Sequence, residues 1–287
     1  MTLVLDAVLS GFLLGAFYAA LAVGVTITFG MLDVPNISHP AFTVLGAFLV
    51  FTANQTFGLD PILAALVVAL AFFIVGAALY KIYHISFEVR GQDPLRGLTF
   101  FFGCMFMLEM ALSLVFGVDI RTVNVAYAKG ILRIGDSVVP FRLLVPAIAS
   151  LGLLSAIYIG LHRTFFGRAI LAGSQDQFAL RLMGVDPIKM RQIAFGVAYA
   201  SAAISGGLLI IIQPVTPLAG EAFIGTVFAI CVLGGLTSTL GTLIGAVLLG
   251  LSESIIGTFF GPSWAPAVAF GLLLIVLAVR PQGLLGR

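Results

Sequence analysis

Long apolar runs separated by short polar breaks form the dominant pattern of this 287-residue chain. A membrane core of about 30 Å is crossed by roughly 20 apolar residues in a helix, and six runs approach or reach that length. The pattern therefore predicts membrane-spanning helices over Leu3–Phe29, Pro61–Tyr80, Leu98–Gly117, Phe141–Leu161, Gln192–Gln213 and Trp264–Val279.

Two further apolar regions do not fit a simple span. Pro40–Ala53 follows the polar break DVPNISHP, and Ala222–Ser252 is too long for one crossing and is interrupted at Gly234–Gly235 and Thr237–Ser238. A broken helix is tolerated in lipid only where protein or a cavity satisfies the freed backbone groups. We therefore predict two broken helices that face inward, with the second break near mid-membrane depth.

The two interruptions resemble each other. Both MLDVPNISHPAF and QPVTPLAGEAF follow a clean span, carry two prolines and end in Ala-Phe. Interrupted helices at matching positions of two halves indicate the binding site of a transporter. The match favours a twofold internal repeat in which Asp33–Phe42 and Pro214–Phe223 approach each other, although so short a match also arises by chance.

Composition indicates a lipid environment. Hydrophobic residues make up 61% of the chain and charged residues 9%, whereas about a quarter of the residues in soluble domains are charged. A soluble fold of this size has no means of burying so much apolar surface. The basic residues lie in short loops, a placement that orients a membrane protein, so we expect a surrounding bilayer and no nucleic-acid partner.

The remaining composition adds little chemistry. The first run carries Asp6 and no basic residue, so we expect a span and not a cleaved signal peptide. Cys104 and Cys231 lie in apolar runs and are expected to be packed thiols, because two cysteines provide no zinc-ligand spacing. The prediction is one all-α, polytopic transmembrane domain over residues 1–287.

One long polar segment, about residues 162–192, stands out. It contains five basic residues against Asp176 and Asp186, and the positive-inside rule therefore places it in the cytoplasm. The C-terminal RPQGLLGR is expected on the same side, and Val118–Pro140 on the other despite its basic residues. If both interrupted regions cross the membrane, the N-terminus lies outside; otherwise both termini are cytoplasmic.

Within this polar segment, Ile170–Met183 has the apolar spacing of an amphipathic helix. Gly184 is expected to end the helix, and Asp186-Pro187 to begin the next turn. Such a basic, amphipathic helix either docks a partner protein or lies at the lipid headgroups. The candidate docking residues are Gly167, Arg168, Asp176, Gln177, Arg181, Gly184 and Asp186.

The sequence contains no motif that is typical of a catalytic site. None of the three lysines lies in the Gly-Lys-Ser/Thr context of a phosphate-binding loop. Clusters with metal-ligand spacing and arrangements typical of a catalytic nucleophile are also missing, so we expect neither an enzyme nor a cofactor or metal site in this chain. Polar residues at the interruptions are instead candidates for a translocation pathway. They are Asn36, Ser38, His39, Pro40, Thr216, Gly220, Glu221, Gly234, Gly235 and Thr237.

The roles of the polar candidates differ. Ser38 or Asn36 is expected to cap the helix that has Pro40 in its first turn, while His39 fits a pore position and a structural position equally. Glu221 is expected to accept hydrogen bonds from free amides near the start of a helix. Glu109 is expected to hydrogen-bond a neighbouring helix.

Several stretches resemble the permease subunits of branched-chain, or hydrophobic, amino acid ABC importers. They are GFLLGAFYAALAVGVTITFGMLDVPNISHPAF, FGRAILAGSQDQFALRLMGVD, FAICVLGGLTSTLGTLIGAVLLGLSES and RPQGLLG. The chain departs from the family where Pro40, instead of glycine, follows His39, and where Leu171 replaces an arginine.

The resemblance implies a non-catalytic translocation subunit in a bacterial inner membrane. It implies as partners a second related permease, two ATP-binding subunits that hold ATP and Mg, and a periplasmic substrate-binding protein. The solute would be a branched-chain or hydrophobic amino acid, or a related small solute such as urea, an amide or an aromatic acid. Two alternatives remain: a proton-coupled carrier that uses Glu221, and a passive channel lined by glycine-rich broken helices.

Overall fold

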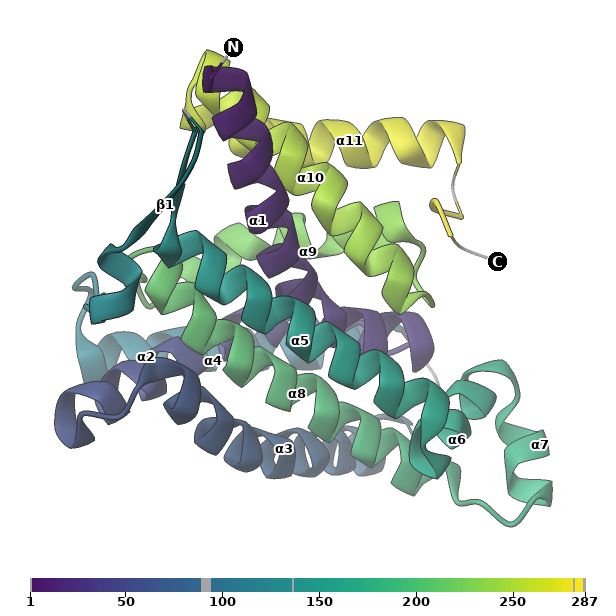
Figure 1. Cartoon of the computed structure of the whole chain (residues 1–287). Coiled ribbons are helices and arrows are strands. Elements are labelled where there is room, and N and C mark those ends of the chain that lie inside the picture. The colour runs from purple at the N-terminus through teal and green to yellow at the C-terminus, as the bar shows by residue number, and fades with distance from the viewer. Residues whose placement is uncertain (1, 89–93, 136, 281, 286–287) are drawn as a thin grey trace.

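The computed structural model describes residues 2–88, 94–135, 137–280 and 282–285. This part of the chain is a bundle of helices with one small β-hairpin (Figure 1), which confirms the all-α prediction. The helices are α1 (Thr2–Val25), α2 (His39–Phe57), α3 (Pro61–Ser86), α4 (Pro94–Phe116), α5 (Phe141–Arg163), α6 (Phe165–Gln175), α7 (Gln177–Leu182), α8 (Pro187–Ile212), α9 (Ala219–Gly234), α10 (Thr239–Phe260) and α11 (Ala265–Val279). Shorter elements are the π-helix Thr26–Met31, the 3-10 turns Ala126–Lys129 and Pro262–Trp264, and strands β1 (Ile131–Ile134) and β2 (Ser137–Pro140).

Seven helices in the described residues are long and apolar enough to cross a membrane. Six of them correspond to the six predicted spans, several with longer ends. The seventh, Thr239–Phe260, begins inside the region that was predicted to be interrupted. The chain is therefore a multi-pass membrane protein.

The two interrupted regions fold differently. The first forms one continuous helix, α2, and the second is divided into α9, which ends at Gly234, and α10, which Ser238 caps. At this second break the amides of Leu284 and Leu285, from the C-terminal segment, donate to the carbonyls of Leu233 and Gly234 in α9, and the expected mid-membrane depth of the break stays a prediction. The twofold repeat and the broken-helix interpretation stay predictions.

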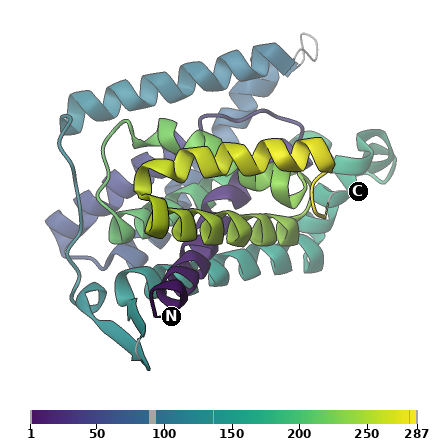
Figure 2. The ribbon, with the colours of Figure 1, turned by 90° about the horizontal axis from the view of Figure 1, so that it is seen from above.

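The hairpin and the α6–α7 segment lie at opposite ends of the bundle (Figures 1 and 2). Val138 of β2 donates its amide to the Asp6 carboxylate at 3.2 Å, so the start of α1 lies at the hairpin end. At the same end, Ser254 of α10 donates to the carbonyl of Ala7. If the basic segment is cytoplasmic, the N-terminus is therefore external and the described C-terminal residues are cytoplasmic.

Side-chain caps that the sequence provides begin five of the described helices. Each cap accepts a backbone amide of its first turn at 2.8–3.1 Å, which satisfies a free donor of a helix start. The caps are Asp60 of α3, Thr164 of α6, Asp176 of α7, Asp186 of α8 and Ser238 of α10. Pro61 and Pro187 follow two of these caps at positions where no amide is needed.

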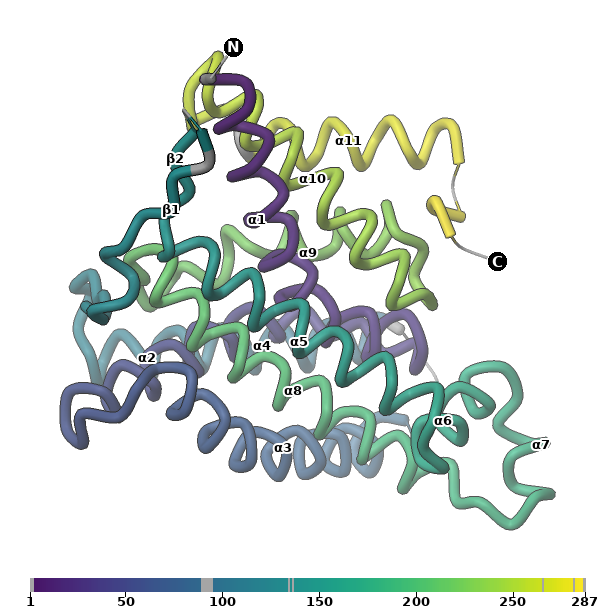
Figure 3. The backbone as a smooth tube through the Cα atoms, viewed as in Figure 1, coloured from purple at the N-terminus to yellow at the C-terminus, as the bar shows by residue number. Residues whose placement is uncertain are grey.

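Helix α8 occupies the centre, packed between α3, α2 and α1, as the tube in Figure 3 traces. Close glycine contacts draw the helices together, as small residues do in membrane bundles. A Cβ at Gly206 of α8 would stand 2.1 Å from the carbonyl oxygen of Thr43 in α2. A Cβ at Gly250 of α10 would stand 2.5 Å from the backbone nitrogen of Gly15 in α1.

Gly250→Ala is therefore expected to destabilise the bundle by about 1–3 kcal/mol, because overpacking forces α1 and α10 apart. Gly271→Ala is the matched control, since a Cβ at this glycine of α11 meets nothing within 4 Å. Thermal unfolding of the purified variants in detergent measures the difference. Equal melting temperatures would show that the α1–α10 contact is dispensable.

Candidate functional site

The polar segment 165–186 folds as two helices, so the single amphipathic helix predicted over Ile170–Met183 is wrong. The carboxylate of Asp176 accepts the amides of Phe178 at 2.8 Å and Ala179 at 3.0 Å. An aspartate that captures these amides starts a new helix in preference to continuing the old one, and it does so here between α6 and α7.

Gly184 ends α7 as predicted. Its φ of 77° suits glycine, its amide donates to the carbonyl of Arg181, and the Val185 amide reaches back to the carbonyl of Leu180. This pair of bonds is the Schellman arrangement that closes a helix C-terminus. Asp186 then caps α8, so a single tight turn joins α7 to the central helix.

The predicted apolar face is divided between two environments. Ile170 is buried against the bundle, whereas Phe178 and Leu182 are 70% and 74% exposed. Three neighbouring apolar side chains are also exposed: Phe165, Phe166 and Met183. We call these five exposed side chains the α6–α7 apolar surface, and such a surface on a polar segment indicates a protein contact or a membrane contact.

The other docking candidates lie around this surface in two settings. Gly167 is a packing residue, because a Cβ there would stand 2.1 Å from the carbonyl oxygen of Gly160 in α5. Gln177 is half-buried. The exposed candidates are Arg168, Asp176, Arg181, Gly184 and Asp186.

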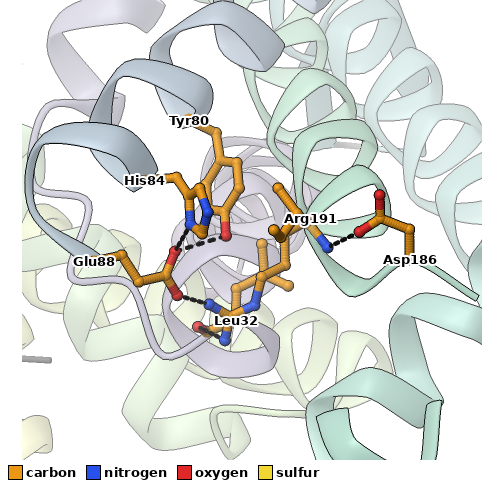
Figure 4. A network of polar contacts seen from close by, with 7 residues as sticks. Leu32, Tyr80, His84, Glu88, Asp186 and Arg191 are labelled. Atoms are coloured by element: carbon orange, nitrogen blue, oxygen red, sulfur yellow. Dashed lines mark hydrogen bonds and ion pairs between the residues drawn. The ribbon is translucent and has the colours of Figure 1, made fainter. Parts of the chain in front are cut away.

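A polar network ties three elements together beside α7 (Figure 4). The Glu88 carboxylate, just after α3, bonds the Arg191 guanidinium of α8, accepts the Tyr80 hydroxyl at 2.9 Å and lies 2.7 Å from His84 Nδ1. Arg191 also donates to the carbonyl of Leu32, next to the π-helix, at 3.1 Å. Sequence analysis missed this network because its members lie up to 159 positions apart.

The network controls the charge of Glu88. Burial alone raises the pKa of this carboxyl, but the hydrogen bond with His84, the Arg191 charge and the Tyr80 hydroxyl together hold the pKa below its ordinary value. A cavity of about 220 Å³ lies between the network and the coupling candidates Gln177 and Arg181.

A second polar cluster lies halfway along α8. The Ser38 hydroxyl donates to Asn36 Oδ1 at 2.8 Å and lies 3.1 Å from the Tyr199 hydroxyl, which also accepts from Asn36 Nδ2 at 3.2 Å. The predicted cap is therefore wrong, since neither side chain caps α2 and Tyr199 of α8 takes their hydrogen bonds instead. Pro40 does lie in the first turn, as predicted.

His39 is fully buried beside this cluster. Its ring packs edge-on to Tyr199 at 6.2 Å and lies over Gly24 of α1. Neither ring nitrogen has a hydrogen-bond partner. Its role on a pathway stays a prediction.

The two interruption segments meet as predicted, where Gly220 of α9 lies against Ala41 of α2. A Cβ at Gly220 would stand 3.0 Å from the Ala41 Cα. Glu221 is exposed and accepts no amide, so its expected role near the helix start is wrong. The carboxylate that lies beside the first turn of α9 is that of Glu109 in α4. Within the described residues, Glu109 does not make the hydrogen bond to a neighbouring helix that was expected of it.

The remaining pathway candidates divide between the two ends of α9. The Thr216 carbonyl accepts the amide of Ala219 before the helix starts. At the other end, Gly234 packs on Gly241, Gly235 ends α9 with a φ of 96°, and Thr237 is exposed. A pathway position for this second group stays a prediction.

A bundle with several membrane-spanning helices and an organised basic segment at one end defines a multi-pass helical membrane protein. The chain matches the family described as branched-chain amino acid transport system, permease component, over residues 7–277, and it belongs to that family. Permease subunits of such ABC systems are non-catalytic, and separate subunits hydrolyse ATP, which confirms that the chain is not an enzyme.

Curated relatives extend this comparison. The chain is 27% identical over 300 residues to BraD of Pseudomonas aeruginosa, a high-affinity branched-chain amino acid permease, with 99% of this chain and 96% of that protein covered. It is also 27% identical to LivH of Salmonella typhimurium, with the same coverage. A shorter match, 32% over 127 residues, joins 44% of this chain to 29% of LivM from the same organism.

One solved structure is also similar. PsaBC from Streptococcus pneumoniae in complex with Fab aligns with a TM-score of 0.51 and 13% identity, covering 98% of this chain and 93% of that one. At this identity the similarity concerns the fold alone.

Glu88→Gln is expected to make the stability of the folded protein less sensitive to acid. Because the folded-state pKa lies below the ordinary value, the unfolded chain binds this proton more readily. The stabilisation from Glu88 is therefore present above about pH 4.3, the ordinary value, and is lost as the pH falls through the lower folded-state value.

Melting temperatures measured from pH 7 downward should show a shallower acid decline for Glu88→Gln than for the wild type, with a lower starting value at pH 7. Asp119→Asn is the control, since that carboxylate is 78% exposed and lies 3.7 Å from Arg121. An unchanged acid profile for Glu88→Gln would contradict the assigned coupling.

Proposed function

We propose that this chain is the translocation subunit of an ATP-driven importer in a bacterial inner membrane, with no cofactor of its own and with ATP and Mg on partner subunits. The observation that carries the proposal is the α6–α7 apolar surface at the basic end of a bundle whose family consists of transport permeases. The assembly would contain two ATP-binding subunits, one of which is the proposed partner of that surface.

The proposed assembly has further members. A second permease is supported by the partial match to LivM alongside the full-length match to LivH. A periplasmic substrate-binding protein would deliver the solute to the end that carries the hairpin. Hydrophobic or branched-chain amino acids are the proposed solutes, because the relatives are branched-chain amino acid permeases, and urea, short amides and aromatic acids are related candidates.

Helix packing supports mechanical coupling from this surface. Gly167 presses α6 onto the end of α5, and the Gly184–Asp186 turn attaches α7 to α8. A movement of an ATP-binding subunit against Phe178 and Leu182 would therefore displace two helices that run to the opposite end of the bundle. A proton-coupled carrier or a channel has no need of such a connection.

Reconstitution in proteoliposomes tests the proposal. Uptake should require ATP and both ATP-binding subunits, and it should persist when a protonophore collapses the proton gradient. Uptake without the ATP-binding subunits would support the channel, and uptake driven by a proton gradient alone would support the carrier.

The double variant Phe178→Ala, Leu182→Ala should lose copurification with the ATP-binding subunits and about tenfold or more of the uptake, because buried aromatic and aliphatic anchors dominate protein interfaces. Phe57→Ala is the matched control, since Phe57 is 79% exposed at the end of α2. Normal copurification of the double variant would place the ATP-binding subunits elsewhere.

A further inference from the structure

Glu109 is a carboxylate within an apolar helix, with no hydrogen-bond partner among the residues that the structure describes. Its side chain is fully buried in α4, and neither oxygen accepts a hydrogen bond from these residues. A charged group in this setting is costly unless another charge or dipole compensates it, and ionisable groups inside a membrane usually mark a functional site. Glu253 of α10 differs, because the side chain of Tyr18 lies beside it.

The surroundings of Glu109 are the starts of two helices. A Cβ at Gly220, in the first turn of α9, would stand 3.0 Å from Glu109 Oε1 and 3.1 Å from the backbone nitrogen of Ala41, in the first turn of α2. The carboxylate therefore lies beside the first turns of two helices, the ends at which helix dipoles are positive. Glycine at position 220 keeps this approach open.

An accessible carboxylate lies next to the buried one. Glu221 follows Gly220, is exposed, and is close enough for its charge to act on Glu109. A carboxylate exposed to lipid would be costly, so we take this face of α9 to border a polar passage or a subunit interface that encloses one. The passage would lead from Glu221 to Glu109.

We infer that Glu109 and Glu221 form a transient binding site for the ammonium group of the transported solute. This inference rests on the proposed function and narrows its substrates to solutes that carry a primary ammonium, such as hydrophobic amino acids. A zwitterion that enters the bundle leaves the water that solvated its ammonium, and an unpartnered carboxylate replaces that solvation. Urea and aromatic acids lack the group that this site would bind.

The test uses the complete transporter in proteoliposomes, with leucine uptake and ATP hydrolysis measured together. Glu109→Gln should reduce the uptake rate about tenfold or more, the effect expected of a lost charge-assisted hydrogen bond. Stimulation of ATP hydrolysis by the loaded binding protein should stay within about twofold of the wild type, because solute delivery and the ATP-binding subunits are unchanged. Glu109→Asp should recover part of the uptake, and Glu253→Gln is the control for loss of another intramembrane carboxylate.

A second measurement identifies the ligand chemistry directly. During turnover, a hydrophobic carbodiimide should modify Glu109, as mapped by mass spectrometry. Protection by 3-methylbutylammonium, but not by 4-methylpentanoate at the same concentration, would support an ammonium site. Equal protection by both compounds, or uptake and ATP hydrolysis that fall together in Glu109→Gln and Glu109→Asp alike, would overturn the inference.

Failure of this inference is distinguishable from failure of the proposed function. Wild-type uptake that depends on ATP, together with normal uptake by Glu109→Gln, would remove the ammonium site and keep the importer. Uptake that a protonophore abolishes in the wild type, but not in Glu109→Gln, would instead assign proton transfer to Glu109 and overturn both.

Discussion

Helix ends inside the bundle are the constraint on which the rest of this structure depends. Both α2 and α9 begin beside one another, where Ala41 meets Gly220, among buried residues of the protein. Backbone groups left free at such a depth must find partners within the protein. The neighbouring polar residues follow from that requirement: Asn36 and Ser38 bond Tyr199 on one side, and Glu109 lies on the other.

The same constraint explains why glycines lie where helices approach the central helix α8 and each other. Two helix starts can approach α8 and each other only where side chains are minimal, as at Gly206 and Gly220. Because α8 contacts α2, α3, α1 and α5, its position fixes the depth at which the interior helices begin. Close packing of this kind leaves few independent movements, so the bundle is expected to shift as packed helices and not residue by residue.

The sequence predicted well what depends on neighbouring residues. Apolar length located six spans, and Asp186-Pro187 and Gly184 marked helix boundaries because their chemistry is local. It failed where a distant side chain competed for the same group. Ser38 was expected to cap α2, but its hydroxyl donates to Asn36 and lies against the hydroxyl of Tyr199, 161 positions away.

The carboxylates show the same limit. The sequence placed Glu221 at a helix start and Glu109 within an apolar run, yet Glu221 is exposed and Glu109 is the one buried beside two helix starts. Their roles depend on how α4, α2 and α9 meet, which no local pattern encodes. The Glu88–Arg191 pair was missed for the same reason, since it joins the end of α3 to the start of α8 across 103 positions.

One rigid element connects the parts of the site. Helix α8 begins at the Asp186 cap beside α7, carries Arg191 of the polar network within its second turn, and holds Tyr199 at its midpoint. At 1.5 Å per residue, about 12 Å separates Arg191 from Tyr199 along the helix axis. A buried helix transmits a displacement over that distance without unfolding, so a push on α7 reaches the Asn36–Ser38–Tyr199 cluster through α8 itself. Because Leu32 is bonded to Arg191, α1 would follow the same movement. The polar network is thus placed to keep α1, α3 and α8 together during any such displacement of α7.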